Sequence, residues 1–290
     1  MSRPDAERPP DLTASNLTIA YGNEIIVDDL ALSIPGQAFT ALIGPNGSGK
    51  STILRALAGL LNVGNGAVML DGQSIARLGV KDLARRIGML AQGPVPPEGL
   101  TVLDLVKQGR YPHRSLFGRW RREDDDACEE ALHLTNMEEL RNRALESLSG
   151  GQRQRAWIAM ALAQETPILL LDEPTTFLDL AHQIEVMELI ADLVDRRGKT
   201  IVAVLHDLNQ AARYADYMVM LKAGSILAKG DPNEVMTASM IERVFGVVGN
   251  IVPDPVTGTP LCIPLAPRRD RARNRTGNML RSDNSGGHLT

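Results

Sequence analysis

Few cysteines and aromatic residues occur in this chain of 290 residues, and basic residues are not in excess. The two cysteines, Cys128 and Cys262, fit neither a metal-binding spacing nor a disulfide framework. Aromatic residues make up 3% of the chain, so stacking platforms for single-stranded nucleic acid are not expected. The net charge of −4 lacks the basic character typical of DNA- and RNA-binding proteins. No nucleic-acid partner is therefore predicted.

Long apolar segments are also missing. Apolar runs such as residues 168–171 and 201–205 are much shorter than the roughly 18 residues of a membrane-spanning helix. Residues 1–12 mix charges with prolines and contain no apolar core, which predicts no signal peptide and a cytosolic protein. The 43% of hydrophobic residues nevertheless suffices to bury a substantial core.

Between two polar ends, strand patterns alternate with helix patterns. Residues 1–12 and the basic segment 267–290 are predicted to be disordered. Strands are predicted at 17–21, 39–43, 68–70, 86–91, 168–171 and 200–205, a hairpin at 217–229, and helices at 51–59 and 152–165. A helical block follows Gln92, and its first helix begins with a cap formed by Thr101 and Asp104. This order predicts an α/β core with an inserted helical subdomain.

A glycine-rich loop, Gly44-Pro45-Asn46-Gly47-Ser48-Gly49-Lys50-Ser51, matches the phosphate-binding pattern G-x-x-x-x-G-K-[ST]. Glycines let successive backbone N–H groups turn toward an anion, and the helix that follows points its positive end at the same place. Lys50 is expected to meet the β- and γ-phosphates, and the Ser51 hydroxyl to ligate Mg²⁺. The loop predicts nucleotide binding; a small-molecule kinase that uses this loop alone remains an alternative.

Two acids, Asp172 and Glu173, end the apolar strand at 168–171. In an open α/β sheet the carboxyl ends of the strands border the phosphate-binding loop. We therefore expect Asp172 to hold Mg²⁺ through water and Glu173 to polarise the attacking water.

A second anion-binding surface is predicted at Leu148-Ser149-Gly150-Gly151-Gln152, because a hydroxyl and free N–H groups begin a helix there. With this segment the sequence resembles the ATP-binding cassette (ABC) ATPases, whose signature is LSGGQ. The resemblance covers residues 13–265. It implies a P-loop NTPase (RecA-like) core at about 13–92 and 166–250, with an antiparallel β subdomain and an inserted α-helical subdomain at about 93–165, all within an ATPase domain at 13–266.

The resemblance also assigns roles to single residues. It implies that Gln92 is the Q-loop residue and a ligand of Mg²⁺ together with Ser51 and Asp172, and that His206 is the switch histidine. Lys50, Gln92, Glu173 and His206 are the implied catalytic residues. The implied ATP contacts are Tyr21, Gly44, Pro45, Asn46, Gly47, Ser48, Gly49, Lys50, Ser51, Thr52, Ser149, Gly150, Gly151, Gln152 and Asp179. Tyr21 is expected to stack on adenine, and Asp179 belongs to the D-loop, where this chain has Thr176-Phe177 in place of the common Ser-Ala.

In this family two copies associate head to tail, so that Ser149 and Gly151 of one copy face the γ-phosphate held by Lys50 of the other. Residues 109–113, 155–164, 178–186 and 253–260 resemble the ATPases of importers for ferric siderophores, haem and cobalamin, and the siderophore branch is the most similar. This implies integral-membrane permease partners that contact residues 93–122, an indirectly associated substrate-binding protein, and a position on the cytoplasmic face of the membrane.

Two alternatives stay open at this stage. One is the same role in haem or cobalamin import. The other, from a different class, is a soluble ABC ATPase acting in translation or DNA repair. The second is less favoured because the sequence has one phosphate-binding loop, one signature and no long coiled-coil insertion. The remaining histidines, His113, His133, His182 and His288, show no ligand spacing and are interpreted as surface residues.

Overall fold

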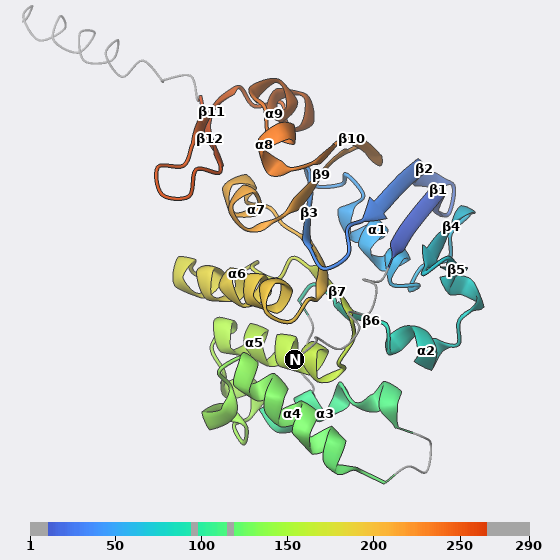
Figure 1. The fold of residues 1–290 in the computed structure, drawn as a ribbon, viewed down its shortest axis with the longest axis vertical. Helices are drawn as coiled ribbons and strands as arrows, with labels where there is room; N and C mark the ends of the chain where they lie inside the picture. The colour runs from blue at the N-terminus through green and yellow to red at the C-terminus, as the bar shows by residue number, and fades with distance from the viewer. Residues whose placement is uncertain (1–10, 94–97, 115–118, 266–290) are drawn as a thin grey trace, which may run out of the picture.

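The centre of the computed structural model, which describes residues 11–93, 98–114 and 119–265, is a six-stranded sheet (Figure 1). Its strand order is β10-β9-β3-β8-β7-β6, and all neighbours are parallel except β9 and β10. The strands are β3 (Phe39–Ile43), β6 (Ile87–Leu90), β7 (Ile168–Asp172), β8 (Thr200–Val204), β9 (Tyr217–Lys222) and β10 (Ser225–Gly230). The predicted strands at 39–43, 86–91, 168–171 and 200–205 and the hairpin turn at Ala223-Gly224 are confirmed.

Every residue of β3, β7 and β8 is buried, because both faces of the sheet are covered. The alternation of side chains divides these strands between two cores. Phe39, Ala41 and Ile43 face the core shared with the helical block, α6 (Leu180–Asp195) and α7 (Leu208–Tyr214). Leu42 faces the core shared with α1 (Lys50–Leu57) and a second sheet.

The second sheet is antiparallel, in the order β2-β1-β4-β5. Its strands are β1 (Leu12–Tyr21), β2 (Glu24–Ile34), β4 (Asn65–Leu70) and β5 (Gln73–Ser74). β1 begins earlier than predicted: Leu12 is completely buried, and the Asp11 amide donates to Asp71, so the predicted disordered segment does not extend to residue 12. β2 was not predicted, although its alternating apolar residues fit one buried face.

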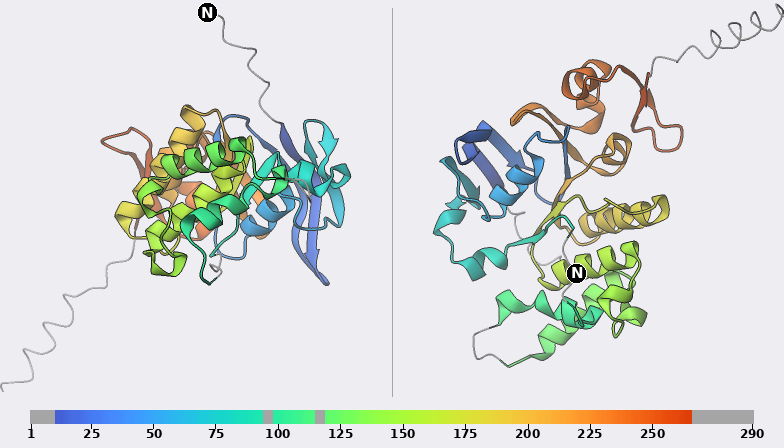
Figure 2. Two further views of the ribbon diagram at one scale, coloured as in Figure 1. Left: turned by 90° about the horizontal axis from the view of Figure 1, so that it is seen from below. Right: turned by 180° about the vertical axis from the view of Figure 1, so that it is seen from behind.

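The helical block contains α3 (Val102–Gln108), α4 (Arg122–Leu134) and α5 (Gly150–Ala163), with short 3₁₀ turns at Tyr111–His113, Glu138–Leu140 and Leu145–Ser147. It lies beside α6 and away from the antiparallel sheet in both views (Figure 2). The predicted cap is confirmed, since Thr101 and Asp104 form a reciprocal capping box at the start of α3. The signature helix α5 begins at Gly150 and ends at Ala163. Its first and last residues each lie two positions before those of the predicted helix, 152–165.

Six further elements belong to the described residues. They are a 3₁₀ turn (Ile75–Arg77), α2 (Val80–Ala84), α8 (Pro232–Val235), α9 (Ala238–Phe245), β11 (Gly249–Pro253) and β12 (Pro260–Pro264). Among the described residues, no helix combines the length and apolar character needed to cross a membrane. Residues 1–10 and 266–290, for which disorder was predicted, lie outside the described residues.

Candidate active site

The phosphate-binding loop connects β3 to α1. Gly47 and Gly49 adopt left-handed backbone angles, with φ of 76° and 92°, and Gly44 lies so close to the Leu221 carbonyl that a side chain would not fit. No side chain caps α1 at Gly49, so its first N–H groups are left to a ligand. The sequence forms this loop because only glycine permits these turns and this close approach.

Lys50 is buried beneath the loop. Its Nζ donates to the carbonyl oxygens of Gly44 and Pro45 at 2.8 and 3.0 Å. Burial lowers the pKa of Lys50, while the nearby carboxylates Glu173 and Asp172 act in the opposite direction. A phosphate in the loop would give the ammonium a charged hydrogen-bond partner in addition to these two carbonyl oxygens.

Ser51 and Asp172 form a polar corner between α1 and β7. Ser51 Oγ donates to Asp172 Oδ1 at 2.7 Å. Asp172 Oδ2 is buried without a hydrogen-bond partner, and its nearest cation, Arg55, is 3.7 Å away. Burial raises the pKa of Asp172.

This donor set fits a hard divalent cation. A hydroxyl and a carboxylate oxygen are ligands that Mg²⁺ prefers. Across the residues the structure describes, no group of three His, Cys, Asp or Glu side chains is arranged to hold a metal.

Glu173 lies at the centre of a converging polar group. Its carboxylate accepts from Gln92 Nε2 at 2.5 Å and Thr176 Oγ1 at 3.0 Å, and lies 2.7 Å from His206 Nε2. The backbone of Glu173 is left-handed, with φ of 55°, a conformation that costs free energy for a side-chain-bearing residue. Three loops, which follow β6, β7 and β8, thus direct their side chains to one carboxylate.

These residues border a cleft of about 580 Å³. Its lining comprises Tyr21, Ile26, residues 46–52, Gln92, Glu173, Thr176, Phe177 and His206. Tyr21, at the end of β1, is about half exposed and can offer its ring to a base. The structure therefore brings together the predicted phosphate-binding and catalytic residues, and it adds Ile26, Thr176 and Phe177.

The predicted signature residues do not line this cleft. Ser149 caps α5 through a reciprocal capping box with Gln152, with distances of 3.2 and 3.1 Å between their donors and acceptors. Asp179 likewise caps α6, by accepting from the His182 amide. Within one chain, Ser149, Gly150, Gly151, Gln152 and Asp179 thus belong to a different surface.

A family model described as "ABC transporter" matches residues 27–176. The ferric enterobactin transport ATP-binding protein FepC of Escherichia coli is 52% identical over 88% of this chain and 94% of its own length. The chain belongs to the ABC transporter family. The iron(3+)-hydroxamate import ATP-binding protein FhuC of Bacillus subtilis is 50% identical, over 87% of this chain and 94% of its own.

A solved structure agrees with this ABC assignment. It is a dimeric, post-hydrolysis ATP-binding cassette bound to ADP and Pi, with a TM-score of 0.66 and 31% identity, and the match covers 76% of this chain and 98% of that one. The chain is thus an ABC ATPase with a P-loop NTPase core that binds and hydrolyses ATP, as the sequence predicted.

Proposed function

We propose that this ABC ATPase powers the import of an iron–siderophore complex through a membrane permease, from the cytoplasmic face of the membrane. The similarity to FepC and FhuC over nearly their whole lengths carries this proposal, since both names describe transport of ferric chelates. Haem or cobalamin import and a role in translation or DNA repair have no comparable support from these relatives.

In the proposed mechanism, Glu173 polarises the water that attacks the γ-phosphate. His206, Gln92 and Thr176 orient its carboxylate, and Lys50 stabilises the charge on the phosphates. Mg²⁺, held by Ser51, Gln92 and Asp172, would screen the charge of the phosphates. Tyr21 stacks on the adenine at the rim of the cleft.

The signature surface requires a second copy of the chain. Because Ser149 and Gly151 do not line the cleft of their own chain, we propose that they complete the cleft of the partner in a head-to-tail homodimer. Two bound ATP molecules then lie between the copies, and their binding energy closes the dimer.

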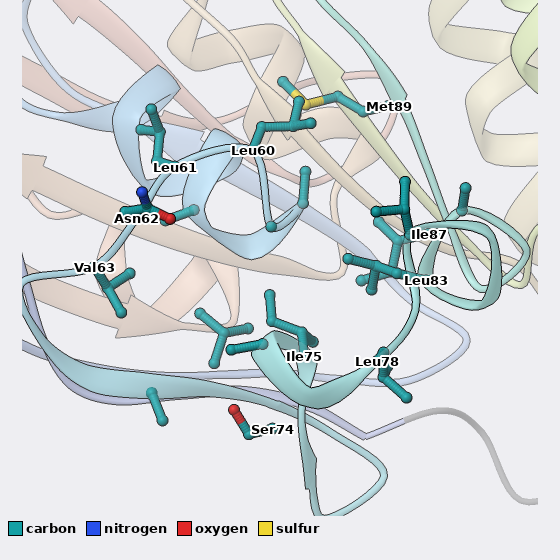
Figure 3. A pocket seen from close by; sticks show the side chains of 18 of the residues that line it. Leu60, Leu61, Asn62, Val63, Ser74, Ile75, Leu78, Leu83, Ile87 and Met89 are labelled. Carbon is teal, nitrogen blue, oxygen red and sulfur yellow. The ribbon is translucent and has the colours of Figure 1, made fainter.

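A second cavity offers a place for the permease. This groove of about 710 Å³ lies between the C-terminal end of α1 and β6, and Leu60, Leu83 and Met89 contribute to its apolar lining (Figure 3). Leu60 and Val80 are 65% and 87% exposed at the groove. α1 begins at Lys50, and β6 leads to Gln92, so both elements run from the groove to the nucleotide cleft. We propose that an amphipathic helix of the permease occupies it.

The predicted contact segment, residues 93–122, is only partly suited to this role. Val102, Leu105 and Val106 are completely buried in the core of the helical block, so these three side chains are not available to a permease. Tyr111 is exposed and lies beside Lys81 of α2, at 5.4 Å between its ring and Nζ. Residues 94–97 and 115–118, with Leu116 and Phe117, lie outside the described residues.

Leu60→Glu tests the groove. A buried carboxylate would oppose docking of an apolar helix, so we expect copurification with the permease to be lost while ATP hydrolysis by the isolated ATPase stays within about twofold of wild type. Val256→Glu, at an exposed site on the β11–β12 loop, is the matched control. Normal copurification of the Leu60→Glu variant would rule out docking at this groove.

Reconstitution tests the cargo. The ATPase is assembled with its copurified permease and a substrate-binding protein, and hydrolysis is measured with ferric siderophores, haem or cobalamin. We expect stimulation by ferric siderophores. Stimulation by haem or cobalamin, but not by ferric siderophores, would contradict the proposed cargo. Stimulation by nucleic acid without any permease would refute the transport role.

A further inference from the structure

The D-loop, residues 175–179, has little packing of its own. Phe177 is 93% exposed and left-handed, with φ of 63°, and Leu180, the first residue of α6, is 69% exposed. Only Leu178 packs against the core, and it is partly buried. A strained, exposed loop needs other contacts to keep one conformation.

His182 supplies such contacts on one side of the loop. Its amide donates to Asp179 Oδ1 at 3.0 Å, and its ring Nδ1 lies 2.7 Å from the same oxygen. Both hydrogen bonds lower the pKa of Asp179, so the carboxylate is ionised at neutral pH and Nδ1 carries the proton. The ring also lies directly against Gly151 of α5, where any added side chain would collide with it. The imidazole therefore joins the D-loop to the signature helix.

Gln183 supplies contacts on the other side. Its Nε2 donates to the Leu178 carbonyl at 3.0 Å, and its Oε1 accepts from Gln210 Nε2 at 2.8 Å. Gln210 belongs to α7, whose cap residue, Asp207, directly follows His206. The Gln183 amide therefore joins the D-loop to the helix that carries the switch histidine.

We propose that His182 and Gln183 form a D-loop clamp, two positioning residues that hold the loop between the signature helix and the helix after His206. The inference rests on the proposed role of Glu173. Thr176, which lies within the clamped loop, donates to the Glu173 carboxylate at 3.0 Å and also contacts its backbone carbonyl through its amide, at 3.3 Å. Loosening the loop therefore displaces the catalytic carboxylate, while the phosphate-binding loop of the same chain, residues 44–51, keeps its own contacts.

The size of the effect follows from the geometry of the reacting groups. A misplacement of about 1 Å near a reacting centre can lower a rate by roughly 100-fold. A loop that samples several positions, the productive one among them, should cause only part of this reduction in rate. We expect the clamp variants to lower kcat by about tenfold and to leave KM for ATP within about twofold.

Three substitutions separate the parts of the clamp. His182→Phe keeps the ring against Gly151 and removes the donor to Asp179, whereas His182→Asn keeps a donor at the position of Nδ1. Gln183→Leu removes both of its hydrogen bonds and approximately keeps its shape. We expect low kcat in His182→Phe and Gln183→Leu, and rescue toward wild-type kcat in His182→Asn. Asp195→Asn, at the exposed C-terminal end of α6, is the matched control and should behave as wild type.

The purified full-length ATPase is assayed for kcat, KM, equilibrium ATP binding and melting temperature. Wild-type kcat in both His182→Phe and Gln183→Leu would overturn the proposal. A loss of kcat that only follows a loss of ATP binding or of folded protein would also overturn it, because the role would then be structural. Glu173→Gln is measured in parallel. Persistent turnover in that variant contradicts the proposed role of Glu173, whereas a failure confined to the clamp variants contradicts the clamp alone.

Discussion

Glu173 is the residue on which the proposed chemistry depends, and it can be altered with little change in shape. Glu173→Gln keeps the side-chain volume and removes the negative charge that polarises water. We expect ATP affinity within about threefold of wild type and turnover lowered by at least roughly 100-fold, the effect typical of losing a general base. Single-turnover hydrolysis and equilibrium ATP binding measure the two quantities. Glu234→Gln, on the short helix α8, is the control; equal turnover in both variants would contradict the assignment.

At the scale of residues, sequence patterns identified side chains whose chemistry is local. The spacing of Gly44, Gly49, Lys50 and Ser51 is a property of one continuous loop, so it could be recognised before any fold was known. The partners of Glu173 come from three loops far apart in the chain. Gln92 and His206 were identified only through the family resemblance, and the bond from Thr176 depends on a left-handed turn that no sequence pattern specified.

A buried ion pair holds the helices of the helical block together. Arg110, after α3, donates to Asp124 of α4 at 3.0 Å and to the Ala163 carbonyl and Glu165 after α5. Burial works to raise the pKa of Asp124, but hydrogen bonds from Arg110 and the Arg121 amide outweigh it and hold this pKa below its usual value of 3.8. The pair therefore stabilises the fold above that value, and the stabilisation is lost as the pH falls through the lowered pKa.

Asp124→Asn leaves the Arg110 guanidinium buried without this partner. We expect a loss of about 3 kcal/mol in the free energy of unfolding at pH 7, the cost typical of breaking a buried pair. As the pH falls from the usual value of 3.8 toward the lowered pKa, the difference from wild type should shrink, because wild-type Asp124 is progressively protonated and loses its charge. Urea unfolding at several pH values measures both effects. Asp126→Asn, whose partner Arg122 is exposed, should change stability little; a difference for Asp124→Asn that stays constant at all pH values would refute the argument.

Helices and strands could be predicted where the sequence carries one strong local pattern. The buried strands β7 and β8 are continuous apolar runs, and the start of α3 carries its own cap. β2 is long and its pattern is interrupted by a register shift, and α5 begins with two glycines that helix propensity disfavours. Tertiary contacts fix the ends of these elements, so their boundaries could not be obtained from local sequence.

At the scale of the whole molecule, each chain carries the two halves of the proposed ATP site on two different surfaces. Lys50 and Glu173 border the cleft, whereas Ser149 begins α5 outside it. Lys50→Ala should abolish ATP binding in one half-site, and Ser149→Arg should block the other half-site with a large cation. If both substitutions act in one self-contained site, a mixture of the two variants stays inactive. If the sites form between copies, each mixed dimer contains one intact site formed by the loop of one copy and the signature of the other.

Mixing the two variants therefore distinguishes these arrangements. In a Glu173→Gln background, which we expect to retain bound ATP, each variant alone should occlude no nucleotide. An equal mixture that exchanges subunits freely should recover about one quarter of the ATP occluded by the Glu173→Gln protein without further substitutions, since about half of the dimers are mixed and each has one of two sites intact. The measurement is labelled ATP retained after rapid desalting. Undiminished occlusion of ATP by either variant alone would contradict the head-to-tail homodimer. So would the absence of occlusion in a mixture of folded chains, because sites shared between copies can be rebuilt from two defective copies.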